Sequence, residues 1–132
     1  MSSPKRAMDL VKAAEAAIET LTVEAAEKLL ADPSVVFVDV RDVRELAREG
    51  KMPGAYHAPR GMLEFWIDPT SPYHKSVFDP AKTFVFFCAA GWRSALAAQT
   101  AKEMGLDDAR HIAGGFTAWR DAGAPVDGPS DS

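Results

Sequence analysis

Residues 83–94, which read Thr-Phe-Val-Phe-Phe-Cys-Ala-Ala-Gly-Trp-Arg-Ser, decide how this chain folds. The apolar run at 83–87 is short and continuous, as is typical of a parallel strand buried on both faces. Cys88 follows it directly. A loop of small residues then leads into a helix predicted over 93–104, with Gly105 as its C-terminal cap. This order of strand, loop and helix places Cys88 at the carboxyl edge of a parallel sheet, where such folds bind ligands.

Strand and helix signals alternate on both sides of this stretch. Strands are predicted at 20–21, 35–38, 55–58 and 110–112, and helices at 22–30, 42–48, 61–67 and from Gly114-Gly115 to about 123. We therefore predict an α/β fold with a small parallel β-sheet of about four to five strands and helices on both faces. One domain is expected over 1–132, with an N-terminal helical extension at 1–19 and a flexible tail at 128–132. An amphipathic helix at 5–18 is expected to pack on the domain or, alternatively, to form a dimer contact.

Composition narrows the classes of partner. The net charge is -4 and basic residues form no run, so no nucleic-acid partner is expected. No apolar stretch approaches the roughly eighteen residues that a membrane span needs, and we expect a soluble, cytoplasmic protein without a membrane partner. The three histidines, His57, His74 and His111, share no metal-ligand spacing with one another or with Cys88, so no metal site is expected.

Cys88 is the only cysteine of the chain, and its surroundings favour a reactive thiolate. The small residues Ala89, Ala90 and Gly91 let successive backbone N–H groups surround one point, and the positive end of the following helix adds to that field. Arg93, a permanent cation, would face either the sulfur or an anionic substrate. The alternative interpretation is an inert cysteine in the core.

Several segments together resemble the single-domain rhodaneses. Residues 88–94 match the C-x-x-G-x-[RT]-S loop of that family, residues 38–41 with Glu45 match its D-V-R-x-x-x-E segment, and 52–55 resemble its I-P-G-A turn. The closing motifs of the family have counterparts as well: its G-G-x-x-A-W motif is similar to Gly114-Gly115 with Trp119, and its G-x-P-V motif is similar to residues 123–126. The resemblance spans residues 20 to 127, and ordered motifs are far more specific than one alone.

This resemblance implies a sulfurtransferase that moves a sulfane sulfur from thiosulfate or a persulfide to cyanide, a thiol or a protein acceptor, through a Cys88 persulfide. It implies no cofactor, and leaves open whether the chain is a monomer or a homodimer. Near the site, Asp39 is interpreted as a structural residue that fixes the loop, and Arg41 as its partner or that of Glu45, with direct substrate contact as the second interpretation. Cys88 would be catalytic, and the residues implied to bind substrate are Ala89, Ala90, Gly91, Trp92, Arg93 and Ser94.

Three other functions stay open. Cysteine phosphatases of similar fold use a C-x5-R loop, whereas Cys88 to Arg93 is C-x4-R, one residue shorter. A cysteine–histidine hydrolase would need a base such as His57. A non-enzymatic sulfur carrier or redox sensor would use the same reactive Cys88.

Departures from the family pattern narrow the expected donor. Lys51 replaces the family's usual histidine before the turn, and Ala89 and Ala90 are neutral where the two-domain enzymes have basic residues. We therefore expect weak activity on thiosulfate and a persulfide or protein-bound sulfur as donor, with Trp92 shaping access. His57, Arg60 and an apolar rim from 61–66 are expected at the mouth of the site, and Trp119 in the core.

Overall fold

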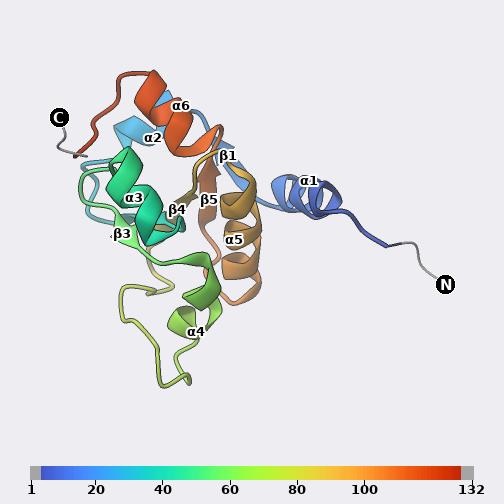
Figure 1. Ribbon diagram of the computed structural model, residues 1–132. Coiled ribbons are helices and arrows are strands. Elements are labelled where there is room, and N and C mark those ends of the chain that lie inside the picture. Colours follow the sequence, from blue (N-terminus) through green and yellow to red (C-terminus); the bar gives the residue numbers. More distant parts are fainter. Residues whose placement is uncertain (1–3, 129–132) are drawn as a thin grey trace.

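The computed structural model describes residues 4–128, and its centre is a five-stranded parallel sheet (Figure 1). Across the sheet the order is β1-β5-β4-β2-β3, and every neighbouring pair is parallel. The predicted α/β class and parallel sheet are therefore confirmed. In that spatial order, the strands are Glu19–Leu21, Ala109–Ile112, Thr83–Phe87, Val35–Asp39 and Tyr56–His57.

Helices cover both faces of the sheet because the central strand β4 buries alternate residues on opposite sides. Phe84 and Phe86 pack into one apolar cluster with α4 and α5, while Val85 and Phe87 pack into a second cluster with α2 and α6. Figure 1 shows α1 lying beyond α5, and Val11 of α1 packs against Ala95 of α5. The helices are α1 (Ala7–Ala17), α2 (Val23–Lys28), α3 (Val43–Glu49), the 3₁₀ turn η1 (Arg60–Met62), α4 (Leu63–Ile67), α5 (Trp92–Glu103) and α6 (Gly115–Asp121).

The two ends of the chain differ in part from the prediction. Asp127 is not free, because it forms an antiparallel bridge with Lys51, whose N–H lies 2.9 Å from the Asp127 carbonyl oxygen. The expected flexible tail lies outside the described residues from 129 onward, as does the start of the N-terminal extension at 1–3. The extension does contain the predicted helix, but Glu19 at its end already belongs to strand β1. Within residues 4–128, no helix has the length and apolar character needed to cross a membrane.

Candidate active site

The Cys88 loop joins β4 to α5 and holds the sulfur at its base. Cys88 is only 1% exposed, and the Gly91 N–H donates a hydrogen bond to its Sγ over 3.1 Å. Gly91 adopts φ +107°, a left-handed conformation that favours glycine. The first-turn N–H groups of Trp92, Arg93 and Ser94 have no carbonyl one turn back inside the helix, and none donates to an acceptor within residues 4–128. The loop therefore presents unpaired backbone donors beside the sulfur.

Helix α6 holds the carbonyl groups of the same loop. The Phe116 N–H donates to the Cys88 carbonyl oxygen over 2.7 Å, and the Thr117 N–H donates to that of Ala89 over 3.1 Å. This close approach requires Gly115, where φ is +61° and an added Cβ would collide with the Cys88 oxygen and lie 2.7 Å from the Ala89 oxygen. The predicted Gly114-Gly115 turn is thus the contact that fixes the peptide orientation of the loop.

Arg93 turns toward α3. Its Nη1 and Nη2 donate to Glu45 Oε1 and Oε2 at 2.8 and 3.0 Å, which forms a two-pronged ion pair. The hydrogen bonds from Arg93 lower the pKa of Glu45 to about 2, against the opposing effect of burial. Both terminal nitrogens of Arg93 are thus engaged by Glu45, which raises the pKa of Arg93, and the guanidinium also interacts with the Cys88 side chain, which adds to this rise.

Asp39 and Arg41 form a buried ion pair at the end of β2. Arg41 Nη2 donates to Asp39 Oδ2 at 2.8 Å and to the Gly50 carbonyl oxygen at 2.9 Å, and both side chains are nearly inaccessible. The Arg41 guanidinium also lies 4.2 Å from the centre of the Phe116 ring. Of the two partners expected for Arg41, the structure selects Asp39, because Glu45 is occupied by Arg93. This geometry fits the structural interpretation of the pair.

His111, which the sequence left without a role, approaches the site from β5. Its Nδ1 lies 3.1 Å from Ser94 Oγ, which in turn lies 3.6 Å from Cys88 Sγ. The signal available in the sequence was a histidine inside the strand predicted at 110–112. His57, considered as a base, instead places Nε2 2.7 Å from the Arg41 carbonyl oxygen.

A cavity of about 210 Å³ opens beside the loop. Arg60 lines this cavity, and its Nη1 forms an ion pair with Glu64 Oε1 at 2.9 Å. The predicted apolar rim is only partly present, because Leu63 is buried in the core whereas Phe65 is exposed. Trp92 is also exposed, next to the loop. The residues that line the cavity are Val40, Arg41, Asp42, Pro59, Arg60, Gly61 and Arg93.

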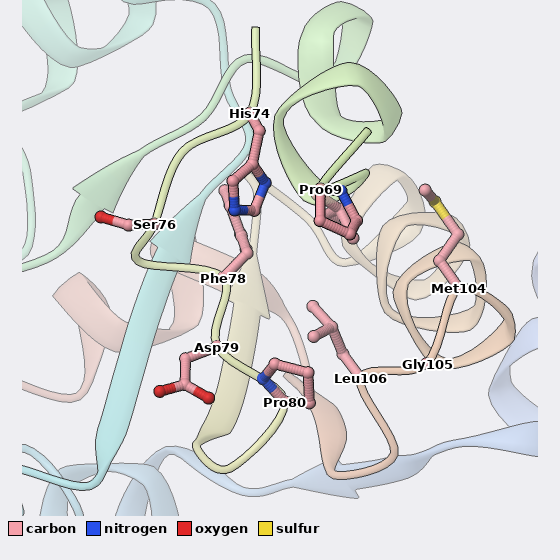
Figure 2. Close-up of a pocket in the computed structure, with 10 residues that line it drawn as sticks. Pro69, His74, Ser76, Phe78, Asp79, Pro80, Met104, Gly105 and Leu106 are labelled. Atoms are coloured by element: carbon pink, nitrogen blue, oxygen red, sulfur yellow. The ribbon is translucent and has the colours of Figure 1, made fainter. Parts of the chain in front are cut away.

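A larger cavity, of about 320 Å³, lies far from Cys88 (Figure 2). It is located at the C-terminal end of α5, a helix of twelve residues that begins at the Cys88 loop. Pro69, Pro80 and Leu106 give it apolar walls, and His74 binds the Trp66 carbonyl oxygen through Nδ1 at 3.0 Å. Within residues 4–128 there is no group of three or more histidine, cysteine or acidic residues arranged to hold a metal ion.

Comparison with known proteins places the chain in a family. The family described as rhodanese-like domain matches residues 22–122. A Bacillus subtilis protein named "Putative sulfurtransferase YtwF" is 32% identical over 101 residues, which cover 76% of this chain and 88% of that protein. The mouse "Thiosulfate sulfurtransferase/rhodanese-like domain-containing protein 3" is 32% identical over 98 residues, 70% of this chain, and the match spans only 62% of the mouse protein.

Two solved structures resemble the whole chain. A Rhodopseudomonas palustris protein of unknown function, named a possible tyrosine phosphatase, is 51% identical with a TM-score of 0.91, and the match covers 96% of this chain and 98% of the other. The homodimeric polysulfide-sulfur transferase of Wolinella succinogenes is 34% identical with a TM-score of 0.74, and the match covers 93% of this chain and 88% of the other. The names of these two proteins point to different reactions.

Proposed function

The chain belongs to the family of rhodanese-like domains, and from that premise we propose that it transfers a sulfane sulfur through a persulfide on Cys88. The relatives that are named as sulfurtransferases support this class of reaction. The observation that carries the proposal is the position of Cys88 Sγ, which accepts a hydrogen bond from Gly91 inside a loop of unpaired N–H groups. Such donors stabilise negative charge on the sulfur and on an atom attached to it.

The reaction proceeds in two displacements. The Cys88 thiolate attacks the outer sulfur of the donor, a new S–S bond forms, and the electron pair of the broken S–S bond leaves with sulfite when the donor is thiosulfate. The outer sulfur of the resulting persulfide carries the negative charge that the loop N–H groups then bind. A thiolate or cyanide attacks this sulfur, and Cys88 returns to the thiolate form.

A persulfide is the preferred donor in this proposal. Thiosulfate carries two negative charges, but the guanidinium closest to the loop, that of Arg93, is paired through both nitrogens with Glu45. The neutral side chains of Ala89 and Ala90 add no charge to the loop. Comparable turnover with thiosulfate and with glutathione persulfide would contradict this preference.

Intact-protein mass spectrometry tests the proposed function. Wild-type protein is incubated with thiosulfate or glutathione persulfide and desalted, and cyanide is then added, with Cys88→Ser treated in parallel. We expect a gain of one sulfur atom on the wild type alone, followed by its loss with formation of thiocyanate. No gain from either donor would refute the proposal.

Phosphate-ester hydrolysis is a second candidate, favoured by the name of the Rhodopseudomonas protein. Two features of this chain oppose it. Only four residues separate Cys88 from Arg93, and Arg93 is held by Glu45 rather than left free to bind two phosphoryl oxygens. Hydrolysis of p-nitrophenyl phosphate that disappears in Cys88→Ser would establish this activity instead.

The third candidate is a carrier that forms the persulfide but passes the sulfur only to a partner protein. It shares the first displacement with the enzyme and differs in the second. A stable persulfide combined with slow release to cyanide and to small thiols would favour the carrier. Rapid thiocyanate formation over many cycles would favour the enzyme.

A further inference from the structure

Three consecutive hydrogen bonds connect the buried sulfur of Cys88 with an exposed residue at the edge of the sheet. Cys88 Sγ lies 3.6 Å from Ser94 Oγ, Ser94 Oγ lies 3.1 Å from His111 Nδ1, and His111 Nε2 lies 3.1 Å from Thr20 Oγ1. Ser94 and His111 are almost completely inaccessible, whereas Thr20 on the edge strand β1 is exposed. The sulfurtransferase steps described above use neither His111 nor Thr20.

The direction of these bonds depends on whether Cys88 carries a proton. A thiolate can only accept, so Ser94 must donate to it, and the Ser94 oxygen must then accept from His111 Nδ1–H. The other nitrogen, Nε2, in turn accepts from the Thr20 hydroxyl. Burial lowers the pKa of His111 below its ordinary value, although Glu15 opposes this shift, and the ring therefore remains neutral at neutral pH with one N–H to place.

We propose that His111 is a positioning residue for the Cys88 thiolate: its Nδ1–H fixes the Ser94 hydroxyl as a donor to the sulfur, and the Thr20 hydroxyl donates to its Nε2 in that state. When Cys88 binds a proton, each of the three hydrogen bonds reverses its direction. The thiol donates to Ser94, Ser94 donates to Nδ1, and Nε2–H donates to Thr20, whose own proton has come from water. Ser94, His111 and Thr20 each gain one proton and give up one, and Cys88 keeps the one proton that enters from solvent, so the ring remains neutral in both states.

Of the other charged groups near the site, Arg93 also interacts with the Cys88 side chain, which contributes, after Glu45, to the raised pKa of Arg93. Arg93 is paired with Glu45, and Arg41 with Asp39, so the charge of each is balanced by a partner. Glu15, on α1, acts on His111 and favours its protonated form. A protonated ring would still donate to Ser94 but could no longer accept from Thr20.

The rate of alkylation of Cys88 by iodoacetamide as a function of pH tests this proposal. It rests on the proposed role of Cys88 as a reactive thiolate, but alkylation requires no sulfur transfer, so failure of the two proposals can be told apart. For His111→Val we expect the midpoint of the alkylation profile to rise by about half to one pH unit, and the rate below it to fall about 3- to 10-fold. His111→Asn, which keeps a donor near Nδ1, should restore most of the rate.

Two further variants separate positioning from a general loss of packing. Thr20 is exposed, and valine has nearly the same shape as threonine. Thr20→Val should therefore raise the midpoint of the alkylation profile, but by less than His111→Val does. In the Ser94→Ala background, His111→Val should add no further shift, because the link to the sulfur is already broken. The proposal would be overturned if the midpoint stayed unshifted both in Thr20→Val and in a folded His111→Val. It would also be overturned if His111→Val shifted the midpoint equally in the wild-type and the Ser94→Ala backgrounds.

Discussion

At the scale of single residues, Gly115 is where the structure tolerates least change. Its φ of +61° strains any other residue, and an added Cβ would collide with the Cys88 carbonyl oxygen. We expect Gly115→Ala to lower the free energy of unfolding by about 3 kcal/mol or more, the combined cost of strain and displacement of the loop. Gly123→Ala is the matched control, because its φ is +80° but nothing lies within 4 Å of the new Cβ. Urea unfolding of both variants measures the difference, and equal losses would show that the contact with the loop is unimportant.

The Asp39–Arg41 pair makes a second prediction at this scale. Arg41→Leu leaves the Asp39 carboxylate buried without its cation, which we expect to cost about 3 to 5 kcal/mol of unfolding free energy. Arg44→Leu removes an exposed partner of Asp42 and should leave the urea midpoint unchanged. The double variant Asp39→Leu with Arg41→Leu should recover part of the loss, because no unpaired charge remains. Equal midpoints for Arg41→Leu and wild type would contradict the structural interpretation of this pair.

At the scale of elements, the pattern of apolar residues predicted the strands and helices better than their ends. Strand β4 has the predicted bounds because its four apolar residues, 84–87, are buried in the centre of the sheet. The helix predicted at 22–30 stops at Lys28, since the N–H groups of Leu29 and Leu30 bond to carbonyls three residues back, as in a 3₁₀ turn. Such end effects depend on hydrogen bonds that the pattern of side chains does not encode.

The link between α3 and α5 gives a prediction on pH. Glu45 has a pKa of about 2 in the folded chain against 4.5 as its ordinary value, so its ion pair with Arg93 contributes fully above pH 4.5. As the pH falls from 4.5 toward 2, the unfolded chain takes up this proton first, and the contribution is lost. Glu45→Gln, which keeps an oxygen for the Asp42 N–H, should therefore be less stable by roughly 1 to 3 kcal/mol at pH 7 and nearly equal to wild type near pH 2.

Urea unfolding of wild type and Glu45→Gln over this pH range measures the effect. Glu49→Gln serves as control, since Glu49 lies on the same helix but at its exposed end, paired with Arg48 and Arg120. A difference between wild type and Glu45→Gln that persists unchanged from pH 7 to pH 2 would show that the ion pair with Arg93 is not its cause.

At the scale of the whole molecule, the sequence predicted the place of the candidate site in the fold but not the contacts around it. Cys88 and Gly91 could be recognised because local order places them between a buried strand and a helix. The partners of the loop could not be recognised from local order, because in the sequence Glu45 lies 48 residues from Arg93 and His111 lies 17 residues from Ser94. Only the order of strands in the sheet, which sets β5 beside β4, brings His111 to the sulfur. The catalytic role of Cys88 and the substrate-binding roles of 89–94 stay predictions.

A single, buried cysteine also determines how this chain must lose a bound sulfur. The chain has no second thiol to attack a Cys88 persulfide, and Cys88 is 1% exposed, so the sulfurs of two molecules cannot readily meet. We therefore expect protein loaded with one sulfur and freed of donor to keep it until a small acceptor is added. Mass spectrometry over time, at low and at high protein concentration, measures the loss. A loss that accelerates with protein concentration and yields a disulfide-linked dimer would contradict the argument, because it would require that Cys88 emerges from its loop.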